Sequence, residues 1–205
     1  MPFDHDIQTP GTLPQVIEGN YCVGCGACAV ASQNVSMELN EYGCFVPQID
    51  LEENLEGAAR VCPFTGQGIN EDEIGAKFFG PNLEHDSRIG FYSNVYGGHV
   101  KADDYREKAS SGGMGSWLLA ELLERGMVNR IIHVERHAPS QQDRLLFRYS
   151  ISESVEELRT KSKSHYYPVE LSQVMQQVQQ VEGNYAVVGV PCYLKAVRLL
   201  CMHNL

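Results

Sequence analysis

Three closely spaced cysteines near the start of the chain constrain its fold more than any other feature. Residues 21–28 read Tyr-Cys-Val-Gly-Cys-Gly-Ala-Cys, so Cys22, Cys25 and Cys28 recur every three residues with glycines between them. Thiolates at this spacing converge on one object when the backbone wraps tightly around it, as the ligands of a cubane cluster do. The interleaved glycines permit the unusual backbone angles that such wrapping requires. The segment therefore predicts a site for one 4Fe–4S cluster.

The fourth ligand of this cluster is expected to be Cys62. In two-cluster bacterial ferredoxins, a cysteine that follows the third after a gap of three ligates the other cluster, and this chain has Ser32 there. The remaining ligand is then a distant cysteine followed by proline, and Cys62 precedes Pro63. Cys44 is the rival ligand, but it stands in a segment that is typical of a turn and a strand.

A structural zinc site is the alternative to the cluster. Such sites use two separated cysteine pairs, or cysteine with histidine, at characteristic spacing. Three cysteines at a repeat of three do not follow that pattern, and no histidine stands close to Cys62 in the sequence. The chain has seven cysteines, an odd number, and the cytosol disfavours a disulfide framework, so metal chemistry is the better interpretation.

Composition excludes some classes of function. The chain has 205 residues, 43% of them hydrophobic, and a formal net charge of −10. An acidic chain lacks the clustered Lys and Arg that bind nucleic-acid phosphates, so no nucleic-acid partner is expected. No apolar run is long enough to span a membrane, and the polar start of the chain does not resemble a signal peptide. We therefore expect a cytoplasmic protein.

The chain is expected to divide into a small module and a larger domain. Residues 1–20 are an irregular lead-in, and residues 21–68 form a ferredoxin-like 4Fe–4S module. A polar connector with Gly and Pro follows over 69–88, and residues 89–205 form the second domain.

Helix and strand patterns alternate in the second domain, which predicts an α/β fold, with α+β as the alternative. Apolar patterns place helices over 114–125, 171–181 and 193–202, and strands within 89–100 and over 130–134, 145–151 and 185–190. Ser154 with Glu157 predicts a capping box for a short helix over 154–159.

A Gly-rich turn enters the first of these helices. Ser110, Ser111, Gly112 and Gly113 immediately precede Met114. The N-terminus of a helix offers free backbone N–H groups and a positive dipole end to an anion, and Ser hydroxyls add donors. A turn that only caps the helix is the alternative interpretation.

Further candidates carry weaker signals. The triplet Lys161, Ser162 and Lys163 is a small basic island, which a solvated loop would also explain. Three histidines are candidate contacts for a flavin or a substrate: His99, His133 and His165.

Two cysteines lie near the end of the chain. Cys192 follows the 185–190 strand, where open α/β sheets place ligands, although a buried structural cysteine is an equal alternative. Cys201, in the next helix, is expected to be a core residue.

Taken together in this order, the motifs resemble the coenzyme F420 hydrogenase/dehydrogenase beta-subunit family, which includes 7-hydroxymethyl chlorophyll a reductases. The resemblance runs from Tyr21 onward. It rests on the cysteine motif at 21–28, Val-Cys-Pro-Phe at 61–64, Asn-Glu-Asp-Glu at 70–73, Ala-Ser-Ser-Gly-Gly at 109–113, Lys-Ser-Lys at 161–163 and Val-Gly-Val-Pro-Cys at 188–192.

The resemblance implies an iron–sulfur flavoprotein oxidoreductase with a 4Fe–4S cluster and FAD. In that family the flavin lies in the larger domain and exchanges hydride with coenzyme F420 or another organic substrate, and a redox partner protein is expected. The resemblance places the flavin contacts at two motifs, residues 110–113 and residues 161–163. An adaptor subunit that carries the cluster but no flavin is the alternative function. No residue is singled out as catalytic.

Relatives in this family usually continue beyond the Pro-Cys motif with more cysteines. The resemblance therefore implies a C-terminally truncated chain with an incomplete flavin domain. Cys192 would ligate a second cluster only if the chain were longer.

Overall fold

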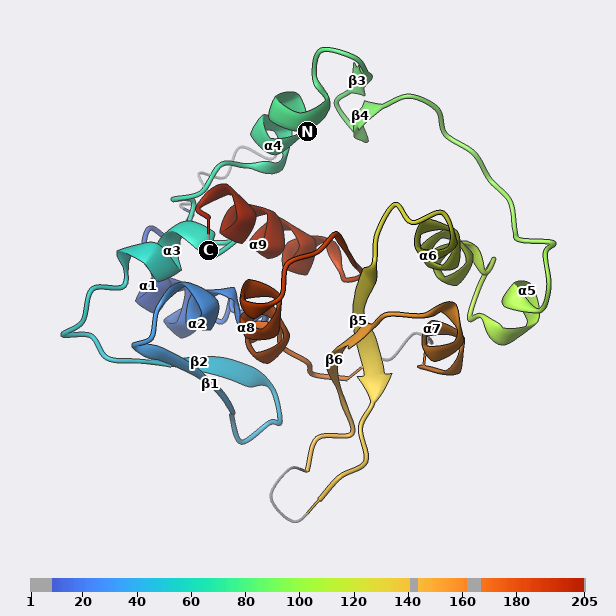
Figure 1. Ribbon diagram of the computed structural model, residues 1–205. Helices are drawn as coiled ribbons and strands as arrows, with labels where there is room; N and C mark the ends of the chain where they lie inside the picture. Colours follow the sequence, from blue (N-terminus) through green and yellow to red (C-terminus); the bar gives the residue numbers. More distant parts are fainter. Residues whose placement is uncertain (1–8, 141–143, 162–166, 205) are drawn as a thin grey trace.

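The computed structural model describes residues 9–140, 144–161 and 167–204. The protein has a mixed α/β fold, as the sequence predicted (Figure 1). The helices are α1 (Leu13–Glu18), α2 (Ala27–Ala31), α3 (Glu56–Val61), α4 (Glu71–Phe79), α5 (Tyr105–Lys108), α6 (Met114–Glu124), α7 (Val155–Lys161), α8 (Ser172–Gln180) and α9 (Pro191–Met202). The strands are β1 (Val35–Leu39), β2 (Phe45–Ile49), β3 (Glu84–Asp86), β4 (Gly90–Tyr92), β5 (Arg130–Arg136), β6 (Phe147–Ser152) and β7 (Tyr185–Val187).

A short antiparallel hairpin follows the cysteine loop. Strand β1 pairs with β2, and Val35 lies opposite Ile49 in the register. The turn is closed by Asn40, whose side-chain oxygen accepts hydrogen bonds of 3.0 Å from the backbone N–H groups of Tyr42 and Cys44. The hairpin places Cys44 beside an exposed turn.

The C-terminal part of the chain is built on a three-stranded sheet of order β6-β5-β7. Strand β5 is antiparallel to β6 and parallel to β7. Successive side chains of a strand point to opposite faces, so the buried Ile131 and Ile132 face opposite sides of the sheet. Ile131 packs in one core cluster with Ala120 of α6 and Leu158 of α7, whereas Ile132 packs with residues of α8 and α9. Helices therefore cover both faces of β5 (Figure 1).

The cysteine segment packs against the second of these faces. Cys25, Ala27 and Val61 belong to the same core cluster as Ile132 and Leu171. The two predicted parts of the chain thus share one hydrophobic core, while the boundaries between them stay a prediction.

Most helix positions agree with the apolar periodicity, and the caps explain where some helices begin. The N–H of Glu157 donates to the hydroxyl of Ser154 at 3.2 Å, which confirms one half of the predicted capping box of α7. The carboxylate of Glu157 accepts from the N–H of Glu153 at 3.0 Å instead of from that of Ser154. Asn70 and Glu73 form a reciprocal capping box at the start of α4. This part of the family motif at 70–73 therefore has a structural role.

One expectation is wrong. Cys201 is exposed on the last turn of α9 and is not a core residue. In α6, Met114 and Leu118 are each about half exposed, and Ala120 and its neighbours make the buried contact. A period of four drifts around a helix with 3.6 residues per turn, so spacing alone does not identify the buried face.

Within the 89–100 segment, only Gly90–Tyr92 forms a strand, and it pairs with β3. The glycines at 97 and 98 are exposed. No helix in the described ranges is long and apolar enough to cross a membrane.

Two glycines with similar backbone angles provide a matched test of how the cysteine loop is seated. Gly24 has φ +69° and Gly43 has φ +74°. A Cβ at Gly24 would lie 2.6 Å from the carbonyl oxygen of Phe45, whereas a Cβ at Gly43 would meet nothing within 4 Å. The left-handed conformation alone costs an L-residue about 1–2 kcal/mol.

We expect Gly43→Ala to lower the free energy of unfolding by only that amount and Gly24→Ala by clearly more, because the loop or β2 must also move. Urea unfolding of the two variants measures the difference. Equal midpoints would show that the loop tolerates displacement from β2.

Candidate functional site

Four cysteines from separate parts of the N-terminal segment line one small cavity. Cys22 and Cys25 lie in the loop before α2, Cys28 lies in the first turn of α2, and Cys62 ends α3. The other lining residues are mainly apolar and come from α1, the cysteine loop, the β1–β2 hairpin and the turn after α3. The fourth cysteine at this cavity is thus Cys62, and Cys44 is not among its lining residues.

Local hydrogen bonds hold Cys62 in this place. The hydroxyl of the buried Thr65 donates to the carbonyl of Ala59 at 2.6 Å. This bond ties the turn after α3 back onto the last turn of that helix, at a point where the helix carbonyls have no partner within the helix. The turn therefore returns the chain toward the cysteine loop.

The electrostatics of the four thiols suit a positively charged partner. Burial raises the pKa of each one, to about 12 for Cys28, and neighbouring thiolates raise the pKa of Cys25, Cys28 and Cys62 further. Backbone hydrogen bonds act in the opposite direction on each sulfur, and Lys195 lowers the pKa of Cys62. An iron–sulfur cluster would supply the compensating positive charge and bind the thiolates. The donor set therefore fits a 4Fe–4S cluster.

Within the described ranges, no group of three or more His, Cys, Asp or Glu side chains is arranged to hold a single metal ion. Cys192 is half-buried at the start of α9, and neither it nor Cys201 lines the small cavity.

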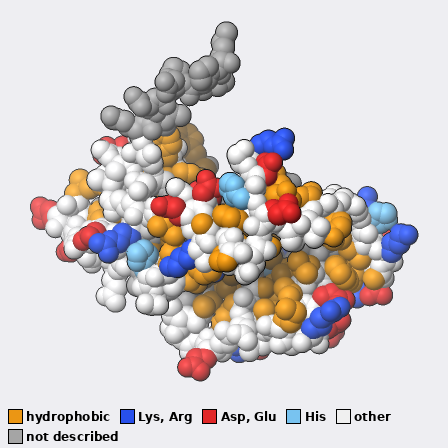
Figure 2. Space-filling view, turned by 90° about the horizontal axis from the view of Figure 1, so that it is seen from above, with side chains coloured by type: hydrophobic (Ala, Val, Ile, Leu, Met, Phe, Trp, Pro, Cys, Tyr) orange, Lys and Arg blue, Asp and Glu red, His pale blue; other side chains and the backbone are white. Residues whose placement is uncertain are grey.

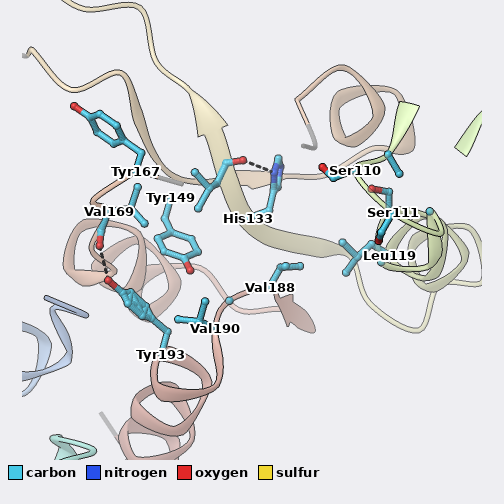
Figure 3. Close-up of a pocket in the computed structure, with 16 residues that line it drawn as sticks. Ser110, Ser111, Leu119, His133, Tyr149, Tyr167, Val169, Val188, Val190 and Tyr193 are labelled. Carbon is cyan, nitrogen blue, oxygen red and sulfur yellow. Dashed lines mark hydrogen bonds between the residues drawn. The ribbon is translucent and has the colours of Figure 1, made fainter. Parts of the chain in front are cut away.

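A second, much larger cavity of about 600 Å³ opens in the α/β domain (Figure 3). Its volume lies within the range of small-molecule and cofactor sites. Its walls come from the start of α6, the strands β5 and β6, the segment before α8 and the connection from β7 to α9. The labelled side chains in Figure 3 are Ser110, Ser111, Leu119, His133, Tyr149, Tyr167, Val169, Val188, Val190 and Tyr193.

The cavity has an apolar rim. Val188 and Val190 line it and are each about half exposed. Figure 2 shows that apolar side chains gather around a hollow on the face seen from above.

The predicted Gly-rich turn forms one wall. Ser110, Ser111 and Gly113 line the cavity, but Gly112 does not. The carbonyl of Gly112 accepts from the N–H of Val100 at 2.9 Å, and a Cβ there would lie 3.0 Å from Gly98 O, so its role is close backbone packing. Gly113 has φ +78° and precedes α6 without a side-chain cap. The N-terminus of an 11-residue helix therefore opens at the cavity wall.

Of the two predicted histidines in the described residues, one lines the cavity. His133 lines the cavity, but its Nε2 lies 2.8 Å from the hydroxyl of Ser152 and its Nδ1 lies 3.3 Å from the carbonyl of Val134. Both ring nitrogens thus contact protein atoms, which favours a structural role. His99 is exposed and does not line the cavity.

Most of the basic island, residues 161–163, lies outside the described part of the structure. Lys161 ends α7, and its side chain is outside the described part of the structure. Ser162, Lys163 and His165 lie outside the described residues.

Two tyrosines that the sequence analysis missed as site residues stand at the cavity. Tyr149 and Tyr193 are both buried, and their ring centroids are 6.2 Å apart. Burial raises the pKa of both, to about 12 for Tyr149, so both remain protonated phenols at neutral pH. The sequence did contain a signal for this site, because open α/β sheets place ligands just after a strand such as 185–190. The residue predicted at that position is Cys192, whereas the next residue, Tyr193, lines the cavity.

A prediction follows for His133. Ser152→Ala removes a hydroxyl that is fully buried against its Nε2, and loss of a buried hydrogen bond typically costs about 1–3 kcal/mol. Ser150→Ala, on the same strand but only half-buried, is the control and should change stability by at most about 0.5 kcal/mol. Thermal unfolding of both variants measures this, and equal effects would contradict the structural role of His133.

The match to a known family covers the part of the chain that forms much of the large cavity, and it does not include the four cysteines of the small one. The family model described as "Coenzyme F420 hydrogenase/dehydrogenase, beta subunit N-term" matches residues 95–176. No curated protein matches the chain. A chain in the structure "Xenon derivatization of the F420-reducing NiFe hydrogenase complex from Methanosarcina barkeri" is similar at 19% identity and a TM-score of 0.43.

The similarity to that hydrogenase chain covers 52% of this protein and 36% of the other chain, so this protein spans about a third of its length. The matched region 95–176 contains the Gly-rich turn, α6, β5 and β6, which form much of the large cavity. Over residues 95–176 the chain matches the model of the coenzyme F420 hydrogenase/dehydrogenase beta-subunit family, N-terminal region, which supports the family predicted from the sequence motifs.

Proposed function

We propose that the protein is an iron–sulfur flavoprotein oxidoreductase that passes electrons between a 4Fe–4S cluster and FAD. The observation that carries the proposal is the presence of two cavities with different linings that both border one hydrophobic core cluster. Four cysteines line the small one, and the large one lies in the region that matches the family model.

In this proposal the cluster is held by Cys22, Cys25, Cys28 and Cys62. The apolar lining around these sulfurs keeps water away from the site, and backbone N–H groups stabilise the thiolates. When bound, the cluster supplies one-electron exchange and FAD supplies hydride exchange, so the pair connects a one-electron donor to a two-electron substrate.

The large cavity would hold the flavin through its shape and its backbone. The start of α6, with Ser110 and Ser111 beside it, offers N–H and hydroxyl donors to phosphate oxygens. The apolar and aromatic walls, including Leu119 and Tyr149, suit a planar ring system. Lys161 and Lys163 remain candidates for further phosphate contacts.

Coenzyme F420 or another small organic molecule is the proposed hydride partner, and a redox protein or subunit is the proposed electron partner. Both follow from the family description and not from a contact of this chain. We also propose a cytoplasmic location on the basis of composition.

An electron-transfer subunit that carries the cluster without flavin is the second candidate function. Among the lining residues that the structure describes, the large cavity has no Lys or Arg to neutralise a pyrophosphate. This observation favours the subunit, because dinucleotides usually need charge-assisted contacts in addition to a helix N-terminus.

The ligand set is tested by a pair of cysteine variants. After anaerobic purification, the wild type should contain about four iron and four sulfide per chain, and Cys62→Ser should lose the intact cluster because it removes one of four thiolates. Cys44→Ser is the matched control and should retain the wild-type content, since Cys44 is exposed and lies outside the small cavity.

The same preparations separate the alternatives. Iron with bound flavin supports the flavoprotein, and iron without flavin supports the electron-transfer subunit. Zinc without iron, or cluster loss in Cys44→Ser alone, would refute the proposed ligand set.

Flavin binding in the large cavity is tested at Gly115, which lines it in the second position of α6. A Cβ at Gly115 would meet nothing within 4 Å, so a larger side chain extends into open space without displacing protein atoms. We expect Gly115→Leu to weaken FAD binding at least about tenfold while stability rises by up to about 1 kcal/mol, because Leu has the higher helix propensity.

Gly115→Ala is the graded control, with the same gain in propensity and a much smaller effect on binding. Fluorescence titration of FAD and urea unfolding measure the two effects. Unchanged FAD affinity in Gly115→Leu would place the flavin elsewhere.

A further inference from the structure

One side chain contacts both candidate sites. Tyr193 lies in the first turn of α9, and its ring lines the large cavity. Its hydroxyl donates to the carbonyl of Val169 at 2.8 Å and to the carbonyl of Val23 at 3.0 Å. Val169 belongs to the wall of the large cavity, and Val23 stands between the first two cysteines and lines the small one.

The cysteine loop is seated on the same wall by backbone contacts. The N–H of Leu171 donates to the carbonyl of Cys25 at 2.9 Å. A Cβ at Gly26 would lie 3.1 Å from the backbone nitrogens of Leu171 and Ser172, so this loop residue lies directly against the start of α8. The segment 169–172 therefore separates the two cavities, and Tyr193 fastens the loop to it.

The hydroxyl of Tyr193 is not placed for proton transfer to a cavity ligand. It has a single proton, which is shared between two protein carbonyls, and Figure 3 shows the oxygen directed at Val169. The side chain is 8% exposed, and desolvation by burial raises the pKa of its phenol. These features indicate that the hydroxyl of Tyr193 has a structural role, as a link between the two sites.

We propose that Tyr193 is a positioning residue that holds the cysteine loop, residues 22–28, at a fixed place against the wall of the large cavity. The proposal deepens the proposed function and rests on it only where it concerns cofactors. The consequence for the loaded protein is that the hydroxyl of Tyr193, which joins chain segments 170 residues apart, acts with the backbone contacts of Cys25 and Gly26 to fix the separation between cluster and flavin.

The test compares Tyr193→Phe with Tyr149→Phe. Phe keeps the ring and its packing at either position and removes only the hydroxyl, and Tyr149 lines the same cavity. Amide hydrogen exchange is measured first on the full chain without cofactors. In Tyr193→Phe the amides of the 22–28 loop and of Leu171 should exchange about tenfold faster, the effect of one lost hydrogen bond on local opening. The β1–β2 hairpin should exchange at the wild-type rate, and Tyr149→Phe should leave the loop unchanged.

The second readout uses the loaded protein. Iron release to a chelator should be faster in Tyr193→Phe by about the same factor, because a ligand can leave only when the loop opens. Electron exchange between cluster and flavin, followed after rapid reduction, should be slower in this variant than in the wild type.

Three results would overturn the proposal: wild-type exchange of the loop in Tyr193→Phe, equal acceleration across the whole chain, or the same loop effect in Tyr149→Phe. The first exchange experiment needs no cofactor, so it decides the role of Tyr193 even if the wild type binds neither iron nor flavin. Such an absence would instead refute the proposed function.

Discussion

The contact between the cysteine loop and the start of α8 is the constraint on which the arrangement of both sites depends. The loop contributes Gly26, which has φ +80° and no side chain, and this permits backbone to meet backbone at Leu171 and Ser172. Leu171 itself is fully buried and belongs to the large core cluster. A bulkier residue at Gly26 would displace the loop, and with it Cys22, Cys25 and Cys28, from the start of α8. The same contact thus sets the place of the loop and completes the core of the sheet.

Strand β5 connects the two layers of helices, because each layer packs on one of its faces. Its two consecutive isoleucines are buried on opposite faces, so each layer of helices packs on one of them. The side chain that follows, His133, is buried at the large cavity and hydrogen-bonded to Ser152 of the neighbouring strand. The cavity is therefore bounded by rigid paired strands on one side and by helix starts on the other. Rigid walls of this kind keep a ligand in one orientation with little loss of entropy on binding.

The sequence predicted the elements of this fold better than it predicted the site. Helices over 114–125, 171–181 and 193–202 follow from local periodicity, and α6, α8 and α9 lie within a residue or two of those ranges. Cys62 was predicted from its neighbour Pro63, a local signal, and it lines the same cavity as the three spaced cysteines.

Tyr193 was missed for a physical reason. Its role depends on contacts with Val23 and Val169, which are distant in sequence and come together only when the core has formed. Local periodicity contains no information on such pairs. Cys201 illustrates a related limit of local patterns. A cysteine in an amphipathic helix occurs on either face, so the sequence did not indicate that Cys201 is exposed.

The charge of the chain gives the local dipoles around the cysteines a particular importance. A net charge of −10 would oppose the addition of electrons to a cluster held by these four cysteines. The backbone N–H groups that lower the thiol pKa values act against this field at close range. Lys195 of α9 acts in the same sense on Cys62, and its ion pair with Glu71, at 3.1 Å, holds the ammonium group in place. Because α9 also carries Tyr193, one helix supplies both a counter-charge for the cysteine site and its attachment to the large cavity, so a shift of α9 would alter the electrostatics and the spacing of the two sites together.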